Sequence, residues 1–407
     1  MGFIFFSVSA WGQEAISPED RLFLEKIQRD TIEYFIRHSD RDTGLTQDSS
    51  RPGSPASIAA TGFSLASIAV AQSHGWIPRQ QAYDQIRKTL LTLQLEAHHQ
   101  NGFFYHFLDP KTGKRAWRSE ASSIGTALLL AGALLAAQYF PETDIPHLVQ
   151  SIYERVNWHW MMNGSPLLSH GWKPESGFLP YYWDTYNELI ILQALAIGAS
   201  KNAIPAEAWE AWDRLEDTYN EKRIVYSHSG SLFTYQFSQA FIDFRNLKDR
   251  DINYFENSRN ASIANWEYSG SFKNQYQGYS EVSWGLSACI GPGGYRAYGG
   301  KPGQGIQDGT IAPYASIGSL VFTPKLSLPA IKFFYQQYLD SLYGPLGFKD
   351  AFNLDKKWWS PEYLGIDQGI SVLMLENFLT DGGIWEKFMR LPAIQKWIDL
   401  CKLRKPE

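Results

Sequence analysis

The sequence predicts an all-α protein, an (α/α)6 toroid, from two observations. Helices with one polar face alternate along the chain with helices that are apolar or small-residue on nearly every face. No Pro- or Ser-rich linker interrupts this alternation after Glu14, so residues 13–407 are expected to form one domain. An amphipathic helix lies on a core and an all-apolar helix is buried all round. About six such pairs therefore predict a ring of helix hairpins, with the apolar helices inside.

The two kinds of helix follow one another in chain order. The amphipathic candidates, expected outside, are Pro18–Phe35, Pro78–Leu95, Ile145–Trp160, Pro205–Leu215, Leu328–Leu342 and Trp385–Cys401. The apolar candidates, expected inside, are Ala56–Ala71, Ala121–Gln138, Leu189–Ala199, Thr310–Phe322 and Gly369–Phe378. The glycine- and aromatic-rich insertions, expected as long loops over the ring, are Ser269–Tyr279 and Gly291–Gly305.

The composition excludes several classes of protein. The 407 residues are 44% hydrophobic and 19% charged, which is too apolar for disorder. The net charge of −5, with no long block of one sign, disfavours a nucleic-acid surface or a polyanionic substrate. Cys289 and Cys401 lack metal-site spacing and are expected as core residues. Aromatic residues make up 15% of the chain, and flat apolar rings suit sugar faces.

The N-terminus has the features of a shortened export signal. Phe3–Ala10 is a compact apolar run, followed by small residues of the kind a signal peptidase cleaves after. No Lys or Arg precedes Arg21, so the usual positive start is missing, and a frayed apolar arm is the alternative. We expect residues 1–12 to be a truncated signal peptide and the enzyme to be periplasmic or secreted, without a membrane span.

Four acidic residues directly precede apolar helices. They are Glu120, Glu188, Asp308 and Asp367. Capping explains each one alone, because carboxylates accept the free N–H groups of a first helical turn. In a ring of inner helices, however, the N-terminal ends of these helices would surround one opening. The four capping acids would then also lie together around one cavity.

Asp184 and Glu188 are the sharpest pair of candidates. If the helix has begun by Asp184, the two acids share one face and oppose each other's ionisation, so one keeps its proton longer. Glycosidic cleavage needs such a protonated carboxylic acid for the leaving oxygen, and we assign that role to Glu188. The alternative for Asp184 is an N-cap. Asp367, with no acidic neighbour nearby in sequence, is expected to stay ionised as the general base.

Aromatic and polar side chains around these acids are the candidate substrate-binding residues. They are Asp184, Tyr105, His106, Trp117, Trp183, Tyr186, Asn187, Trp284, Asp308, Trp359 and Gln368. Core packing is the alternative for each aromatic residue, and a hydrogen-bonded histidine is the alternative for His106, which has no second ligand at metal-site spacing. Asp40, Asp42 and Asp48 lack the spacing of a calcium loop and are interpreted as a turn.

Several segments together resemble one family. GFFYHFLDPKTGKRAW, SEASSIGTALLLAG, WDTYNE, WGLSACIGPGGYRAYGG, DGTIAPYASIGSLVFTP and YLGIDQGISVLMLEN are similar to the successive motifs of the glycoamylase-like domain family, and they stand in the same order. The resemblance implies an (α/α)6 glycoside hydrolase of the type of bacterial β-1,2-glucanases, glycoside hydrolase family 144. By that match Glu188, Asp367 and Glu120 take the positions of family acids.

Two positions depart from the family pattern. Gly125 and the neighbourhood of Ile290 stand where members commonly carry Asp. These losses leave open another linkage preference, transglycosylation or weakened activity.

The sequence therefore predicts an inverting glycoside hydrolase acting on a β-linked glucan, most simply β-1,2-glucan or sophoro-oligosaccharides. Glu188 is the expected proton donor, with Asp367 or Glu120 as its partner, and acid–base chemistry of this kind needs neither metal nor cofactor. The expected partner is an oligo- or polysaccharide, with no nucleic acid, and the expected state is a monomer. The alternatives are a polysaccharide lyase on the same toroid and a non-catalytic glycan-binding protein.

Overall fold

Helices dominate the computed structural model, which describes residues 16–303 and 305–405. The predicted signal segment, residues 1–12, lies outside the described residues. The strands are short, two to four residues each, and all named pairs are antiparallel. Within the described residues, no helix is long and apolar enough to cross a membrane.

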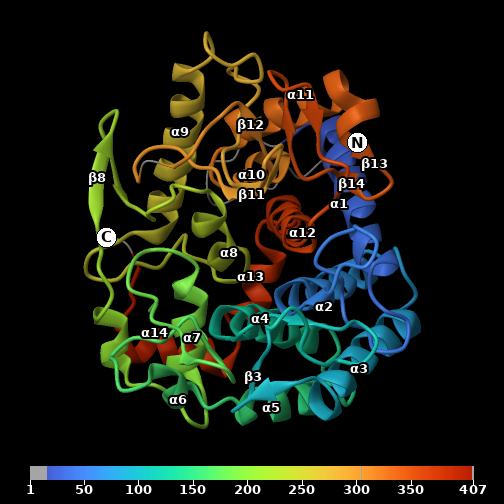
Figure 1. Ribbon diagram of the computed structural model, residues 1–407, viewed down its shortest axis with the longest axis vertical. Helices are drawn as coiled ribbons and strands as arrows, with labels where there is room; N and C mark the ends of the chain where they lie inside the picture. Colours follow the sequence, from blue (N-terminus) through green and yellow to red (C-terminus); the bar gives the residue numbers. More distant parts are fainter. Residues whose placement is uncertain (1–15, 304, 406–407) are drawn as a thin grey trace, which may run out of the picture.

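Six largely buried helices form the interior. They are α2 (Ile58–Ser73), α4 (Ser123–Tyr139), α7 (Leu189–Gly198), α8 (Phe233–Phe241), α10 (Pro313–Gly318) and α12 (Gly365–Leu379). Each packs on the next, and α12 returns to α2, so the contacts close into a cycle. Figure 1 shows α12 near the middle, with α2 and α4 below it and α10 above.

Amphipathic helices cover this interior from outside. They are α1 (Pro18–Arg37), α3 (Arg79–Leu95), α5 (Ile145–Arg155), α9 (Tyr254–Ser271), α11 (Pro324–Leu342) and α14 (Pro392–Leu400). Helix α1 packs on α12, α3 on α2, α5 on α4, α14 on α7, α9 on α8 and α11 on α10. Each inner helix therefore has an outer partner. Shorter helices are α6 (Trp158–Met162), α13 (Gly383–Phe388) and a 3-10 turn, η1 (Ala206–Glu210).

The closest helix crossing, between α2 and α4, depends on two glycines. A Cβ atom on Gly132 would lie 1.8 Å from the carbonyl oxygen of Gly62. A Cβ atom on Gly62 would lie 2.4 Å from the carbonyl oxygen of Leu128. The backbones of α2 and α4 are in direct contact here. A side chain at Gly62 or Gly132 could therefore not be accommodated unless one of the helices moved.

Short strands lead directly into three inner helices. Strand β1 (Ala56–Ser57) precedes α2 and pairs with β4 (Phe107–Leu108). Strand β5 (Ala121–Ser122) precedes α4 and pairs with β6 (Gly171–Lys173), which pairs with β7 (Gly177–Phe178). Strand β12 (Thr310–Ile311) precedes α10 and pairs with β15 (Phe352–Asn353), which pairs with β16 (Trp358–Trp359). The strands thus gather at the N-terminal ends of the inner helices.

The remaining strands form four hairpins. They are β2 (His99–Gln100) with β3 (Phe103–Phe104), β8 (Glu216–Tyr219) with β9 (Lys222–Val225), β10 (Ala288–Gly291) with β11 (Gly294–Ala297), and β13 (Tyr343–Gly344) with β14 (Gly347–Phe348). The predicted loop at 291–305 begins as the turn of the β10–β11 hairpin.

Several predicted elements differ from the structure. The sequence prediction missed α8, because its Gln, Ser and Thr side chains obscure the apolar pattern, and it missed α9, which is rich in Asn and Ser. Pro205–Leu215 contains only η1. The predicted helix Ile145–Trp160 is two helices, α5 and α6. The predicted helix Trp385–Cys401 is also two helices, α13 and α14, and α14 begins at Pro392.

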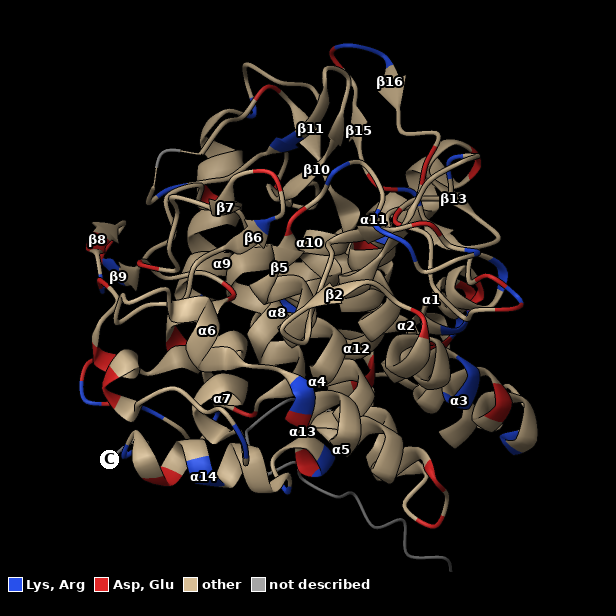
Figure 2. Cartoon of the chain, turned by 60° about the horizontal axis from the view of Figure 1, so that its bottom comes forward, with Lys and Arg blue, Asp and Glu red and all other residues tan. Residues whose placement is uncertain are grey.

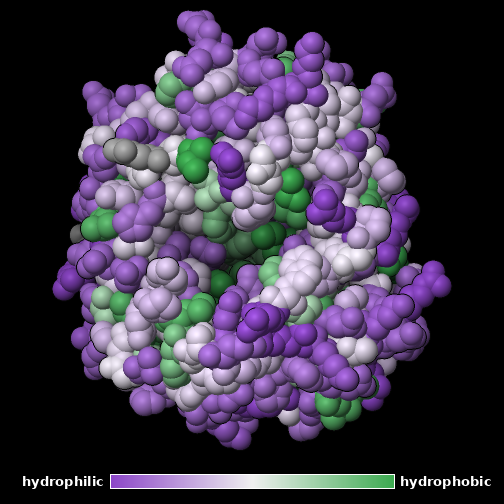
Figure 3. Space-filling view, viewed as in Figure 1, coloured by the Kyte–Doolittle hydropathy of each residue, from purple (hydrophilic) through white to green (hydrophobic). Residues whose placement is uncertain are grey.

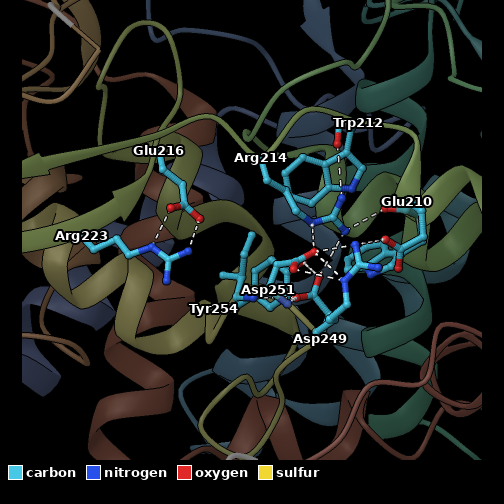
Figure 4. A network of polar contacts seen from close by, with 11 residues as sticks. Glu210, Trp212, Arg214, Glu216, Arg223, Asp249, Asp251 and Tyr254 are labelled. Carbon is cyan, nitrogen blue, oxygen red and sulfur yellow. Dashed lines mark hydrogen bonds and ion pairs between the residues drawn. The ribbon is translucent and has the colours of Figure 1, made fainter.

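Charged residues lie mainly on the outside, with both signs interspersed on the face drawn in Figure 2. One dense polar network lies where the β8–β9 hairpin meets the start of α9 (Figure 4). The Arg214 guanidinium lies 4.0 Å from the Trp212 ring centre and 3.2 Å from Asp249, which accepts a 2.5 Å hydrogen bond from Tyr254. These contacts join residues 212–214 to the start of α9.

Candidate active site

A cavity of about 510 Å³ opens at the N-terminal ends of the inner helices. Figure 3 shows the molecule hollowed in the middle of one face, with hydrophobic surface in the hollow. The titratable side chains that line the cavity are Asp48, Arg51, His106, Glu188, Tyr295 and Glu362. A larger groove of about 1040 Å³ runs past Asp20, Arg245 and Trp385, and none of the predicted site residues lines it. We therefore place the candidate site in the smaller cavity.

Glu188 lies at the start of α7 and lines the cavity. Burial raises the pKa of this carboxyl from 4.5 to about 7. Its side chain makes no capping hydrogen bond; instead Asn187 Oδ1 accepts the Leu189 N–H at 2.8 Å. The capping alternative is therefore wrong for Glu188, whose carboxyl is left available to the cavity, protonated at mildly acidic pH.

The expected reason for the raised pKa of Glu188 is wrong. Asp184 is exposed and precedes the first residue of α7 by five positions, so the two acids do not share a helical face. Asp184 is not the N-cap of α7 either. Burial beside the apolar start of α7, rather than a like charge, holds the proton on Glu188.

Four carboxyl groups cluster elsewhere around the cavity. They are Asp48, Asp350, Glu362 and Asp367. Asp48 and Glu362 line the cavity, whereas Asp350 and Asp367 are almost fully buried next to it. Burial raises the pKa of Asp48, and the neighbouring His106 lowers it in part. Asp48 and Glu362 line the same cavity as Glu188, whose pKa is raised by burial.

Asp367 and Asp350 form a buried carboxyl pair. Asp367 is the third residue of α12, and burial together with the Asp350 carboxyl raises its pKa well above the usual range. Burial raises the pKa of Asp350 to about 6, and its Oδ2 accepts the Ile290 N–H at 2.5 Å. Both oxygens of Asp367 and Oδ1 of Asp350 find no donor among the described residues, and a proton shared by the pair would satisfy two of these three oxygens. The expectation that Asp367 stays ionised without an acidic neighbour is wrong.

Tyr295, on β11, connects the cavity to this pair. It lines the cavity and is 57% exposed, yet burial and the charges of Asp367 and Asp350 raise the pKa of its hydroxyl. Its hydroxyl is therefore near enough to the two acids to feel their charges.

Glu120 is bound to His106 rather than to a helix end. Its Oε1 lies 2.8 Å from Nδ1 of His106, and Ser122 takes the N-cap position of α4. The pKa of Glu120 is lowered, because the hydrogen bond and charge of His106 outweigh its burial. His106 lines the cavity, so Glu120 orients a cavity-lining imidazole.

Most other predicted binding residues pack outside the cavity lining. Trp183 Nε1 donates to Ser123 Oγ at 2.8 Å, and Trp284 is fully buried. Asp308 accepts from Thr310 Oγ1 and from Lys356 Nζ, both at 2.6 Å. Three aromatic residues show the packing alternative, since Tyr105 lies under Arg115, Tyr186 stacks on Tyr235 and Trp359 stacks on Phe352. Gln368 donates to the Phe348 carbonyl.

Of the predicted binding residues, His106 and Trp117 line the cavity. Of the predicted catalytic residues, Glu188 lines it. Sequence reasoning missed Arg51, Asp350, Tyr295 and Glu362, and it interpreted Asp48 as part of a turn. Glu362 stands five residues before Asp367, so an acid close to the GIDQ motif was a usable signal. No cluster of His, Cys, Asp and Glu in the described residues has the arrangement of a metal site.

Comparisons with known proteins agree with this architecture. A β-1,2-glucooligosaccharide sophorohydrolase of Parabacteroides distasonis, exo-acting at the non-reducing end, is 29% identical over 93% of this chain. The chain spans 57% of the length of that curated relative. An endo-β-1,2-glucanase structure from Chitinophaga pinensis superposes with a TM-score of 0.89 at 26% identity, covering 96% of this chain and all of that one. A β-1,2-glucanase structure from Parabacteroides distasonis gives 0.88 at 27% identity, covering 95% of this chain and 60% of that one.

A family model also matches the chain. It is described as "Glycoamylase: Putative glucoamylase", and it covers residues 180–392, which include Glu188, Asp350, Glu362 and Asp367. The match extends over more than half of the sequence. The chain belongs to the glycoamylase family.

Proposed function

We propose that this protein is a glycoside hydrolase that cleaves β-1,2-linked glucan or sophoro-oligosaccharides. The single observation that carries the proposal is Glu188, a cavity-lining carboxyl whose pKa burial raises to about 7. Such a group holds a proton for the leaving oxygen of a glycosidic bond near neutral pH. The names of the similar proteins support the linkage.

We infer that the cycle of six inner helices, each with an outer partner, is an (α/α)6 toroid. The closed contacts of the inner helices and the superposition on glucanase structures support this assignment. In a toroid the N-terminal ends of the inner helices surround one mouth, which is where Glu188, Asp48 and Glu362 line the cavity.

For the partner of Glu188, the contacts favour Asp48. A general base must reach water in the cavity, and Asp48 lines the cavity, where the nearby His106 opposes in part the rise in pKa that burial causes. The roles predicted for Asp367 and Glu120 stay predictions. Asp367 lies against Asp350 and holds a proton more tightly, and Glu120 is bonded to His106.

Inversion is the stereochemical outcome that we propose. Retaining enzymes place their two carboxyl groups about 5 to 5.5 Å apart, and inverting enzymes about 6.5 to 9.5 Å apart. A carboxylate within about 5.5 Å of Glu188 would add to its raised pKa, and burial is the cause that raises it here. We also propose export of the enzyme and action as a monomer.

A lyase function is disfavoured by the charges of the cavity. A uronate substrate needs basic residues to neutralise its carboxylate, whereas the cavity lining has the acids Asp48, Glu188 and Glu362 against one cation, Arg51.

Incubation with linear β-1,2-, β-1,3- and β-1,6-glucans tests the proposed function. We expect new reducing ends from β-1,2-glucan alone. NMR of the first products should show the α-anomer at the new reducing end, because inversion changes the configuration of the cleaved β-bond. Binding of saccharide without new reducing ends would make the protein a glycan-binding module, and unsaturated products from a uronic-acid polymer would make it a lyase.

A further inference from the structure

Trp117 and Arg118 form an unusual turn at the edge of the cavity. Trp117 lines the cavity and is 68% exposed. The Ser119 N–H donates to the Ala116 carbonyl at 3.0 Å, so the two residues are the centre of a tight turn, and their φ angles are +51° and +52°. Asn-Gly is the preferred pair for a turn with two positive φ angles, because larger residues are strained there.

Packing in the core does not explain the strained backbone of the Trp117–Arg118 turn, because Trp117 is exposed. An exposed indole on a left-handed backbone costs stability twice, through its φ angle and through its apolar surface in water. Strained residues of this kind persist where surrounding contacts hold them, and they concentrate at ligand sites. Trp117 stands on the same cavity as Glu188, 5.0 Å from the ring of Phe107, which also lines it.

Arg115 supplies the contacts that hold the turn. Its Nε donates to the Ser119 carbonyl at 2.5 Å and one terminal nitrogen donates to the Arg118 carbonyl at 2.7 Å. Its guanidinium also binds Glu175, in the turn between β6 and β7, through two hydrogen bonds of 2.6 and 2.9 Å. Arg115 lowers the pKa of Glu175 to about 2, which favours the charged form of this carboxyl.

We propose that Arg115 and Glu175 are positioning residues that hold the strained Trp117–Arg118 turn, so that the Trp117 indole forms a glucose-binding subsite at the cavity edge. The inference rests on the proposed function, since the ligand is a glucose unit of the β-linked substrate. The flat apolar face of the indole covers the C–H face of a sugar ring, and Arg51 and His106 on the same cavity offer hydrogen bonds to hydroxyl groups.

The test compares KM and stability in Trp117→Asn. Asn tolerates a left-handed backbone, so this variant removes the ring and relieves the strain. We expect KM for β-1,2-gluco-oligosaccharides to rise about tenfold, the upper end of what one aromatic contact supplies, while kcat stays within about threefold and the melting temperature is unchanged or higher. A residue with a purely structural role would instead lose melting temperature.

Two further variants separate positioning from binding. Arg115→Lys keeps the charge but loses the fork that bonds two carbonyls and a carboxylate, so KM should rise several-fold with kcat preserved. Trp117→Tyr retains a flat ring, so its KM should stay within about threefold of the wild-type value. The matched control is Tyr181→Ala, which removes an aromatic side chain that is 65% exposed and is not part of the cavity lining, and it should leave KM unchanged.

The outcomes separate the two proposals. If the wild-type protein releases no reducing ends from any β-glucan, the proposed function fails. If the wild-type protein is active but Trp117→Asn keeps its KM, or Trp117→Asn and Tyr181→Ala raise KM equally, the subsite proposal is overturned and the proposed function stands.

Discussion

Asp350 and Asp367 lie carboxyl to carboxyl in the wall of the cavity, and three of their four oxygens find no hydrogen-bond donor among the described residues. A carboxylate pair so deeply buried is tolerated when it shares a proton. The pair lies next to the cavity that Asp48, Tyr295 and Glu188 line.

Asp350→Asn should flatten the pH dependence of stability. The pKa values of both acids are raised above the unfolded value of 3.8, so the folded wild type holds protons that the unfolded chain has lost. Wild-type stability therefore falls as pH rises from about 4 through the folded pKa values. The variant removes one acid and the like charge on Asp367, so its melting temperature should fall less between pH 5 and 8. The exposed control Glu207→Gln should follow the wild type, and parallel curves for all three proteins would refute the shared proton.

The activity of the wild type should have an alkaline limb set by Glu188. The proton donor works below its pKa of about 7 and is lost as pH rises through that value, so kcat/KM for short substrates should fall about tenfold for each pH unit above it. A pH–rate profile measures this directly. A profile that is flat from pH 6 to 9 would contradict the donor role.

Glu188→Gln should also become relatively more stable as pH rises. Because the folded pKa is raised, the buried carboxyl favours folding while protonated and costs stability once ionised, by up to about 3 kcal/mol above pH 7. Glutamine cannot ionise, so the difference in unfolding free energy between variant and wild type should grow from pH 5 to pH 8. Denaturant unfolding at both pH values measures it, and a constant difference would mean that Glu188 is not desolvated.

Gly132→Ala should destabilise the fold by about 3 kcal/mol, because the new methyl group meets the carbonyl of Gly62 where α2 crosses α4. Gly270→Ala is the matched control, since a Cβ atom there meets nothing within 4 Å within a helix and alanine favours helix by up to about 1 kcal/mol. Chemical unfolding of both variants measures the difference. Equal stability would show that the helices do not cross as closely as described.

Asp48→Asn should lower kcat by at least about a hundredfold while leaving KM nearly unchanged, because the base acts in the transition state and not in substrate binding. Glu362→Gln tests the other cavity-lining member of the cluster, and Asp367→Asn tests the role first predicted from sequence. If Asp48→Asn retains wild-type kcat and Asp367→Asn does not, the base is Asp367.

The sequence was a good guide to elements with strong local patterns. Helices α2, α4, α7 and α12 were predicted close to their observed bounds because nearly every residue in them is apolar or small. The donor candidate was chosen for its place directly before such a helix and for the like charge of Asp184, and only the first reason agrees with the structure. Helix α9 was missed because its Asn and Ser side chains carry no periodic signal.

Long-range pairing explains the other differences. Asp350 lies 17 residues before Asp367, and only the fold brings the two carboxyl groups together; without that contact, the sequence predicted an ionised Asp367. The strain at Trp117 and Arg118 is likewise a property of backbone geometry, and Trp-Arg carries no turn signal in sequence.

Digestion of linear β-1,2-glucan by the wild type and by Glu188→Gln, at pH 6 with reducing ends counted over time, measures whether Glu188 is the proton donor. We expect steady release of sophoro-oligosaccharides by the wild type and a loss of at least about a thousandfold in the variant, with its melting temperature preserved. Turnover by Glu188→Gln at the wild-type rate would contradict it.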